Sequence, residues 1–153
     1  MPWWKPWKPI LVLASEARVY LTRWSLLPVN RWCRVYLHRI TGPDEGRDLH
    51  DHPWWGIFGV LRGSYEQEIS PDGDPKNARL DEVRWVNTMR PRRNYHRITQ
   101  LRRAAVWTIG FCWIRRPREW GFWVPGKGHV DRHSYRLSER AVLERPLDVP
   151  TDD

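Results

Sequence analysis

The sequence has few of the residues that define several large protein classes. Among its 153 residues are only two cysteines, Cys33 and Cys112, too few and too far apart for a disulfide framework or a thiolate metal site. No apolar run approaches the roughly 20 residues that a membrane-spanning helix needs, so a transmembrane protein is not expected. The apolar stretch at 10–14 is also shorter than the roughly 7 residues of a secretory signal. We therefore expect a cytoplasmic protein with reduced thiols.

Lysine is scarce, whereas arginine and tryptophan are abundant. The 26 basic residues comprise 4 lysines and 22 arginines against 18 acidic residues, which gives a formal charge of +8, and there are 12 tryptophans. A positive charge favours nucleic acid, anionic lipid or a small anion as partner. Most arginines are spread along the chain, as on a solvated surface. The one cluster dense enough to contact a nucleic acid consists of Arg90, Arg92, Arg93, Arg97, Arg102 and Arg103.

Helical periodicity is scarce as well, and two-residue hydrophobic periods take its place. Bulky and β-branched residues form strand-like runs at 35–40, 57–61, 65–69, 83–86, 106–114 and 120–124. Turn signals rich in glycine, proline and aspartate separate these runs at short intervals. The best candidate helix is at 138–144. Many short strands joined by polar turns predict an all-β sandwich or barrel.

The length is that of one compact domain. We expect a barrel at 16–137, between a Trp/Pro/Lys-rich tail at 1–15 and a short helix with an acidic tail at 138–153. The first tail contains Trp3, Trp4 and Trp7. We expect these tryptophans either to contact a membrane interface or to pack against a neighbouring subunit or barrel edge. Five others lie in strand patterns and are expected in the barrel core, namely Trp85, Trp107, Trp113, Trp120 and Trp123.

The most informative segment is the His-Asp-His-Pro-Trp run at 50–54. Side chains two apart on a strand share a face, so His50 and His52 point the same way while Asp51 points away. His96 is the candidate third ligand. Neutral imidazole suits Fe, Zn, Ni or Cu, and three protein ligands with open positions are typical of a reactive site. The sequence therefore predicts a mononuclear divalent-metal site at His50, His52 and His96, whereas His38, His129 and His133 fit structural or surface roles.

These histidines resemble the motifs of the cupin superfamily, whose members are small jelly-roll barrels that hold one metal ion. The first motif reads His-x-His, three or four residues, Glu, six residues, Gly. His50, His52 and Gly63 match it, but Gly56 or Ile57 stands where the glutamate belongs. Glu66 or Glu68 could replace that carboxylate, although a solvated strand face explains them better.

The second cupin motif reads Pro-x-Gly-x-x-His-x-x-x-Asn. Pro91 and His96 match it, while Arg93 and Gln100 replace the glycine and the asparagine. The resemblance spans 36–113 and implies a single cupin-type jelly-roll β-barrel with little helix, and homodimers are frequent among small cupins. The chain also looks like a group of small bacterial and phage cupins that share the His-Asp-His-Pro-Trp segment, a resemblance that brings no substrate with it.

Loss of the glutamate has a chemical consequence. Three neutral imidazoles leave a divalent ion at its full charge and resemble the site of the thiol dioxygenases among cupins, so Fe(II) is expected first, with Zn, Ni, Mn or Cu as alternatives. Such a site favours an anionic ligand. The substrate-binding candidates are Arg93, Arg97 and Arg62, with Arg47 as a further arginine and with Trp54 or Trp55 to stack on a planar group. The candidate proton donors are Tyr36, Tyr65 and Tyr95.

Three functions from different classes follow from these residues. The first is a non-haem metal oxygenase or isomerase that acts on a small anionic molecule. The second is a cupin module that binds a nucleotide or sugar phosphate without turnover, which the missing glutamate favours. The third, ranked last, is nucleic-acid binding through the Arg90 to Arg103 cluster, which predicts a steep dependence on salt.

Overall fold

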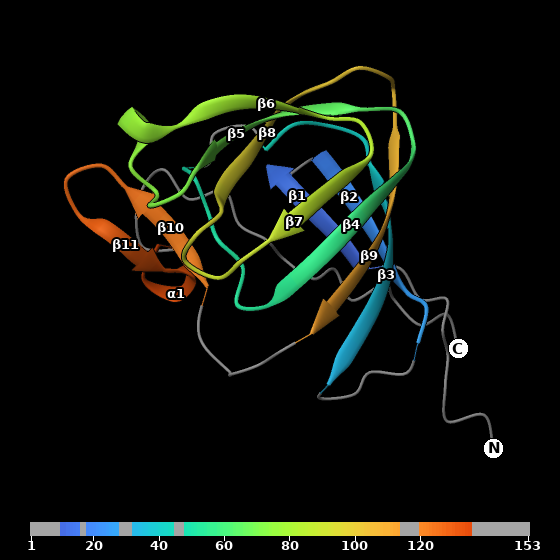
Figure 1. Cartoon of the computed structure of the whole chain (residues 1–153), viewed down its shortest axis with the longest axis horizontal. Helices are drawn as coiled ribbons and strands as arrows, with labels where there is room; N and C mark the ends of the chain where they lie inside the picture. The colour runs from blue at the N-terminus through green and yellow to red at the C-terminus, as the bar shows by residue number, and fades with distance from the viewer. Residues whose placement is uncertain (1–9, 16–17, 28–31, 45–47, 114–119, 136–153) are drawn as a thin grey trace.

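The computed structural model describes residues 10–15, 18–27, 32–44, 48–113 and 120–135. These residues form strands almost throughout, with one 3-10 turn at Pro75–Asn77 and one short helix, α1, at Arg132–Tyr135 (Figure 1). The strands are β1 Ile10–Ser15, β2 Arg18–Ser25, β3 Cys33–Ile40, β4 Trp55–Arg62, β5 Tyr65–Ser70, β6 Arg79–Val83, β7 Val86–Met89, β8 Tyr95–Leu101, β9 Val106–Trp113, β10 Gly121–Val124 and β11 Gly128–Asp131. The prediction of an all-β fold with little helix is confirmed.

The strands form a six-stranded sheet and two smaller ones, and every paired strand is antiparallel. The large sheet has the order β1-β2-β3-β9-β4-β7, and the smaller sheets are β6-β5-β8 and β10-β11. The order brings β3 next to β9, about 70 residues later in the chain. A strand pairing of this kind, between segments far apart in sequence, is what a jelly roll requires.

A short segment around His50 joins the two smaller sheets. His50 and His96 exchange backbone hydrogen bonds of 3.1 and 2.8 Å, so His50 lies beside β8. On its other side His50 forms a bridge with Phe122 of β10. The histidine motif therefore does not lie on a long strand of its own. It is a connecting piece between β8 and β10, and this placement brings His50 against His96.

The core lies between the large sheet and the β6-β5-β8 sheet. One buried cluster combines residues of both sheets: Tyr20, Leu21, Ile40, Tyr65, Val83, Ile98 and Val106. A second cluster toward the histidines consists of Tyr36, Phe58, Met89 and Cys112, with Trp54 packed against it. Burial of these apolar side chains is the main contribution to the stability of the barrel.

Two predictions about tryptophans are wrong. On β9 the inward face consists of small or polar residues, whereas Trp107 is half-buried on the outer face and Trp113 is 38% exposed. The reason is the ring of Phe58, which fills the space in front of β9, so that only small side chains fit there. Trp85 is 80% exposed, because it lies in the two-residue turn between the end of β6 at Val83 and the start of β7 at Val86, and not within a strand.

Two other expectations from the sequence concern residues outside the described part of the chain. They are the helix at 138–144 and the tryptophans of the first tail. Strand β1 falls within the segment at 1–15 and pairs with β2. Trp120 and Trp123 are half-buried. No helix among the described residues has the length and apolarity needed to cross a membrane.

A glycine on β9 offers a test of the packing in front of that strand. A Cβ atom at Gly110 would lie 2.2 Å from Cε1 of Phe58, whereas at Gly59 on β4 the nearest atom would be 3.7 Å away. Gly110→Ala is therefore expected to lower the free energy of unfolding by about 1–3 kcal/mol, the usual cost of overpacking. Gly59→Ala is the matched control and is expected to change it by less than about 1 kcal/mol. Urea unfolding of both variants measures the difference, and equal stabilities would contradict the packing.

Candidate metal centre

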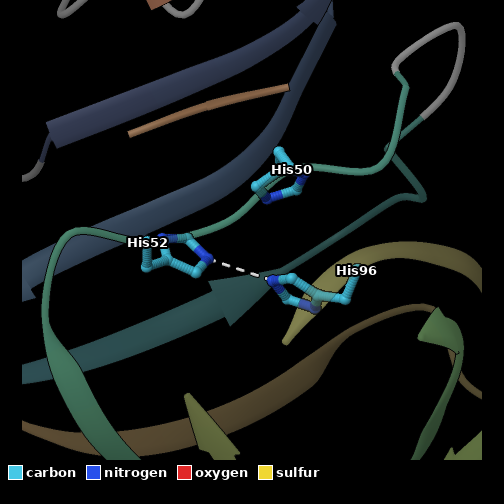
Figure 2. A group of neighbouring side chains, drawn as sticks. All are labelled: His50, His52 and His96. Carbon is cyan, nitrogen blue, oxygen red and sulfur yellow. Dashed lines mark hydrogen bonds between the residues drawn. The ribbon is translucent and has the colours of Figure 1, made fainter. Parts of the chain in front are cut away.

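Three imidazole rings converge inside the barrel. Their ligand nitrogens, one each from His50, His52 and His96, all lie within 4.8 Å of one another. Figure 2 shows His50 and His52 on the connecting segment and His96 on β8, with the Nε2 atoms of His52 and His96 facing each other at 3.0 Å. His50 and His96 are 4% and 5% exposed. The spacing in the sequence thus predicted a group of side chains that the fold brings together.

The distance between the two Nε2 atoms fits two ligands of one ion. Metal–imidazole bonds of about 2.1 Å put adjacent ligand nitrogens about 3.0 to 3.4 Å apart in octahedral or tetrahedral geometry. The same 3.0 Å also suits a hydrogen bond between the two rings when the proton takes the place of the metal. The donor set, three neutral nitrogens with space on one side, suits a borderline divalent ion such as Fe(II), Zn or Ni.

A buried glutamine sets the tautomer of His96. Gln67 is fully buried, and its Oε1 lies 3.0 Å from Nδ1 of His96. A carbonyl oxygen only accepts, so His96 donates from Nδ1 and keeps the lone pair of Nε2 for the centre. Asn87 donates to the same Oε1 at 3.1 Å and to the hydroxyl of Tyr65 at 2.9 Å. These bonds fix the orientation of the His96 ring.

Burial favours the neutral form of His52 and of His96. Burial lowers the pKa of His52 well below its usual value, and the neighbouring His96 and Arg23 lower it further. Burial also lowers the pKa of His96, against an opposing effect of the Asp44 carboxylate. A neutral imidazole is the form that binds a metal ion. The Nε2 atoms of His52 and His96 are therefore available as ligands at neutral pH.

The lowered pKa values predict how stability depends on pH. Besides His52 and His96, His38 has a pKa well below its usual value because of burial, Arg23 and His52. Below about pH 6.5 the unfolded chain binds protons that these buried rings do not, so the metal-free protein loses stability as the pH falls. We expect up to about 1.4 kcal/mol per pH unit for each of the three histidines. Urea unfolding of chelator-treated protein at pH 7.5, 6.5 and 5.5 measures the slope, and a flat profile would contradict the prediction.

The centre opens onto a cavity of about 80 Å³ between the sheets. One water molecule needs about 10–15 Å³ of such space, and pockets for drug-sized ligands begin near 300 Å³, so the cavity suits a small organic molecule. Apart from the three histidines, the residues with polar side chains or ring N–H groups that line it are Tyr20, Arg23, His38, Asp44, Trp54, Tyr65 and Thr108.

Known proteins are similar to this chain in fold and not in sequence. No protein-family model matches the sequence, and no curated protein is similar to it in sequence. Among solved structures, the polyketide cyclase RemF from Streptomyces resistomycificus is similar with a TM-score of 0.52 and 14% identity, over 86% of this chain and 89% of that one. A cupin 2 conserved barrel domain protein from Rhodopseudomonas palustris has a TM-score of 0.51 and 14% identity, over 86% and 85% of the two chains. The chain has the cupin fold.

A third cupin-fold neighbour is the DMSP lyase DddQ from Ruegeria pomeroyi DSS-3, with a TM-score of 0.50 and 11% identity. The match covers 71% of this chain and 54% of that one, so the present chain spans about half the length of that neighbour.

The cupin fold is present here without room for the glutamate of the motif. At Gly56 a Cβ atom would lie 2.9 Å from Cε2 of Phe58, so a longer side chain does not fit inside the barrel. Ile57 is 45% exposed and faces outward. Glu68 binds Arg97 at 2.6 Å, and Glu66 binds Arg102 at 3.2 Å, both on the outer face of β5. The described residues therefore supply imidazole nitrogens at the centre of this cupin barrel and no carboxylate from these four positions.

The arginines proposed from the sequence lie elsewhere in the barrel. Arg97 is on β8 beside His96, but its side chain turns outward to Glu68. Arg62 is exposed at the end of β4, and Arg93 is exposed in the turn before β8. None of these three arginines lines the cavity. Arg47 lies outside the described residues.

The aromatic candidates divide between the cavity and other sites. Trp54 lines the cavity with its ring 5.3 Å from that of His52, whereas Trp55 begins β4 and packs under the guanidinium of Arg90. Tyr65 lines the cavity, and burial raises its pKa far above the usual value. Tyr36 packs against His38, and Tyr95 pairs with His129 at 3.1 Å; neither lines the cavity.

Sequence reasoning missed four residues at this centre. Arg23 on β2 and Asp44, after β3, carry no motif, and only the fold brings them to the cavity. Trp120 is stacked with His52 at 6.5 Å although the two are far apart in the chain. Gln67 did leave a signal, because it alternates with Glu66 and Glu68 and therefore shares the inward face of β5 with Tyr65.

Proposed function

We propose that this chain binds one divalent metal ion through His50, His52 and His96 and uses it to bind and transform a small anionic molecule. The observation that carries the proposal is the convergence of three imidazoles within 4.8 Å, two of them buried and that of His52 half-buried, beside a cavity. Fe(II) is the preferred ion, with Zn, Ni, Mn or Cu as alternatives, and the reaction class is that of an oxygenase or isomerase.

The ion and the residues of the chain would have different roles in binding and transforming the substrate. A divalent ion held by three neutral ligands would supply a Lewis acid with open positions for an anionic oxygen of the substrate. Arg23 adds a second positive charge in the same cavity. Tyr65 keeps its proton because its pKa is raised by burial, so it serves as a hydrogen-bond donor to the ligand rather than as a base. Trp54 and Met89 add apolar surface to the lining of the cavity.

The size of the cavity favours this function over the two alternatives. A volume of about 80 Å³ suits a molecule smaller than a nucleotide or a sugar phosphate. Two arginines of the cluster proposed for nucleic acid, Arg97 and Arg102, are paired with glutamates. The neighbours RemF and DddQ carry the names of enzymes, which supports catalysis on this fold without naming a substrate.

Metal analysis tests the proposal directly. Protein purified without an affinity tag is dialysed, and its metal content is measured by mass spectrometry before and after treatment with a chelator and after reloading with Fe(II) or Zn. We expect one ion per chain, removed by the chelator and restored on reloading. A content well below one ion per chain under every loading condition would overturn the metal site.

A further inference from the structure

Among the polar groups that line the cavity outside the three ligand histidines, three are not fully hydrogen-bonded by the described residues. They are the carboxylate of Asp44, the guanidinium of Arg23 and the indole N–H of Trp54, which come from three different segments. Each of them has hydrogen-bonding capacity that no described residue fills. The Asp44 oxygen and the Trp54 nitrogen are also buried, and buried polar atoms without a partner are rare in proteins.

Asp44 lines the cavity and has one carboxylate oxygen that no described residue binds. The residue is 4% exposed and is held by β8, because its backbone N–H donates to the carbonyl of Ile98 at 2.9 Å and its Oδ2 accepts from the Ile98 N–H at 2.9 Å. Its Oδ1 is buried and has no hydrogen-bond partner among the described residues. A buried carboxylate oxygen without a donor is costly, so a donor from a ligand is the natural complement.

Arg23 and Trp54 present donors. The Nε of Arg23 donates to Nε2 of His38 at 3.1 Å, and its guanidinium lies 4.9 Å from the ring centre of Tyr36. Neither neighbour is an anion, and Arg23 forms no ion pair with a described residue. The Nε1 of Trp54 is buried without an acceptor among the described residues. Together they suit an anionic group, for which the fork of a guanidinium is well shaped.

The two charges are held by opposite sheets of the barrel. Arg23 lies on β2 of the large sheet and bonds to His38 on β3, whereas Asp44 is tied to Ile98 on β8 of the smaller sheet. Arg23 and Asp44 form no ion pair with each other in the described structure. Both line the cavity, so a ligand that spans it between the sheets meets a cation at one end and an anion at the other.

We propose that the cavity selects a small molecule that carries an anionic group at one end, bound by Arg23 and Trp54, and a hydroxyl or ammonium group at the other, bound by Asp44. The inference deepens the proposed function, since it names the substrate class of the same centre. It assigns substrate recognition to residues inside the barrel and not to the surface arginines.

Four probes of equal chain length test the inference. Butanoate, 4-hydroxybutanoate, 4-aminobutanoate and butylamine are titrated into Zn-loaded and chelator-treated protein by calorimetry. We expect 4-hydroxybutanoate or 4-aminobutanoate to bind at least about tenfold tighter than butanoate, because a hydrogen bond to a charged group contributes to this extent. Which of the two binds tighter distinguishes the hydroxyl from the ammonium. Butylamine, which lacks the anion, is expected to bind at least about tenfold more weakly than either.

Two variants test which residue binds each end of the ligand. Asp44→Asn keeps an oxygen for the Ile98 N–H and is expected to abolish the preference over butanoate, while the affinity for butanoate changes by less than about twofold. Arg23→Gln is expected to weaken all three acids at least about tenfold. The matched controls are Glu82→Gln and Arg39→Gln. Both residues are exposed, and Arg39 adjoins His38 on β3 with its side chain on the outer face, so both variants should keep the original affinities.

The results of these titrations test the ligand preference independently of the metal site. Equal affinities for butanoate and its substituted acids, a preference that survives Asp44→Asn, or no binding of any acid to either form would overturn the inference, even if the metal is bound. A preference that persists in chelator-treated protein that holds no metal supports the inference, and the measured metal content decides the metal proposal separately. The ranking of probes by the unsubstituted protein decides the matter even if a variant does not fold.

Discussion

Alanine in place of His96 is expected to abolish metal binding. Only His50 and His52 would remain, and two imidazoles without a third protein ligand do not enclose an ion. Loss of a residue that hydrogen-bonds to a metal ligand typically lowers metal affinity by about 10- to 100-fold. Loss of the ligand itself should therefore lower the affinity by more than about 100-fold. Competition with a chromophoric chelator measures the affinity, and elemental analysis gives the metal content of the purified variant.

Two further variants make this result specific. His133→Ala removes an exposed histidine on α1 and should keep the full metal content. Gln67→Ala leaves all three ligands in place but removes the acceptor that fixes Nδ1 of His96, so an intermediate loss of about 10- to 100-fold is expected. Undiminished metal content in the His96 variant would show that the three histidines do not form the site.

The fold was predictable because its signals are local. Two-residue periodicity placed β3, β4, β5, β9 and β10, since alternation follows from the geometry of any strand that is buried on one face. It gave no sign of the pairing of β3 with β9, which depends on contacts between distant segments. It also assigned the wrong face of β9 to the core, because periodicity identifies two faces and does not say which one a neighbouring ring such as Phe58 will fill.

The candidate centre was predictable only where the residue types are unusual. Two histidines at a spacing of two, with a third at cupin spacing, are rare enough to stand out, and the fold brings them within 4.8 Å. Arginines are abundant, so their number could not indicate which one is inside. Arg23 faces the cavity because β2 alternates Leu21 and Arg23 on one face, and Asp44 does so because β8 holds its backbone.

The largest effect on the architecture of the centre is expected from Asp51, the residue between the two motif histidines. Its side chain is fully buried. Its Oδ1 accepts from the N–H of Gly121 at 3.0 Å and its Oδ2 from the N–H of Arg92 at 3.1 Å. One carboxylate thus ties the histidine segment to β10 and to the turn before β8, where Arg92 has a φ of 58°.

Asp51→Ala is therefore expected to lower the free energy of unfolding by about 2–5 kcal/mol, because two backbone N–H groups lose their acceptor and a buried one costs about 1–3 kcal/mol. Metal affinity should fall with it, since the segment that orients His50 and His52 loses its anchor. Asp72→Ala is the matched control: Asp72 also accepts several hydrogen bonds, but it is exposed and holds only its own turn, so a loss below about 1 kcal/mol is expected. Urea unfolding at pH 7.5 of metal-free protein measures both. If the Asp51 variant were as stable as the Asp72 variant, the carboxylate would not be the tie between these segments, and the geometry of the centre would have to rest on the bonds of His50 to His96.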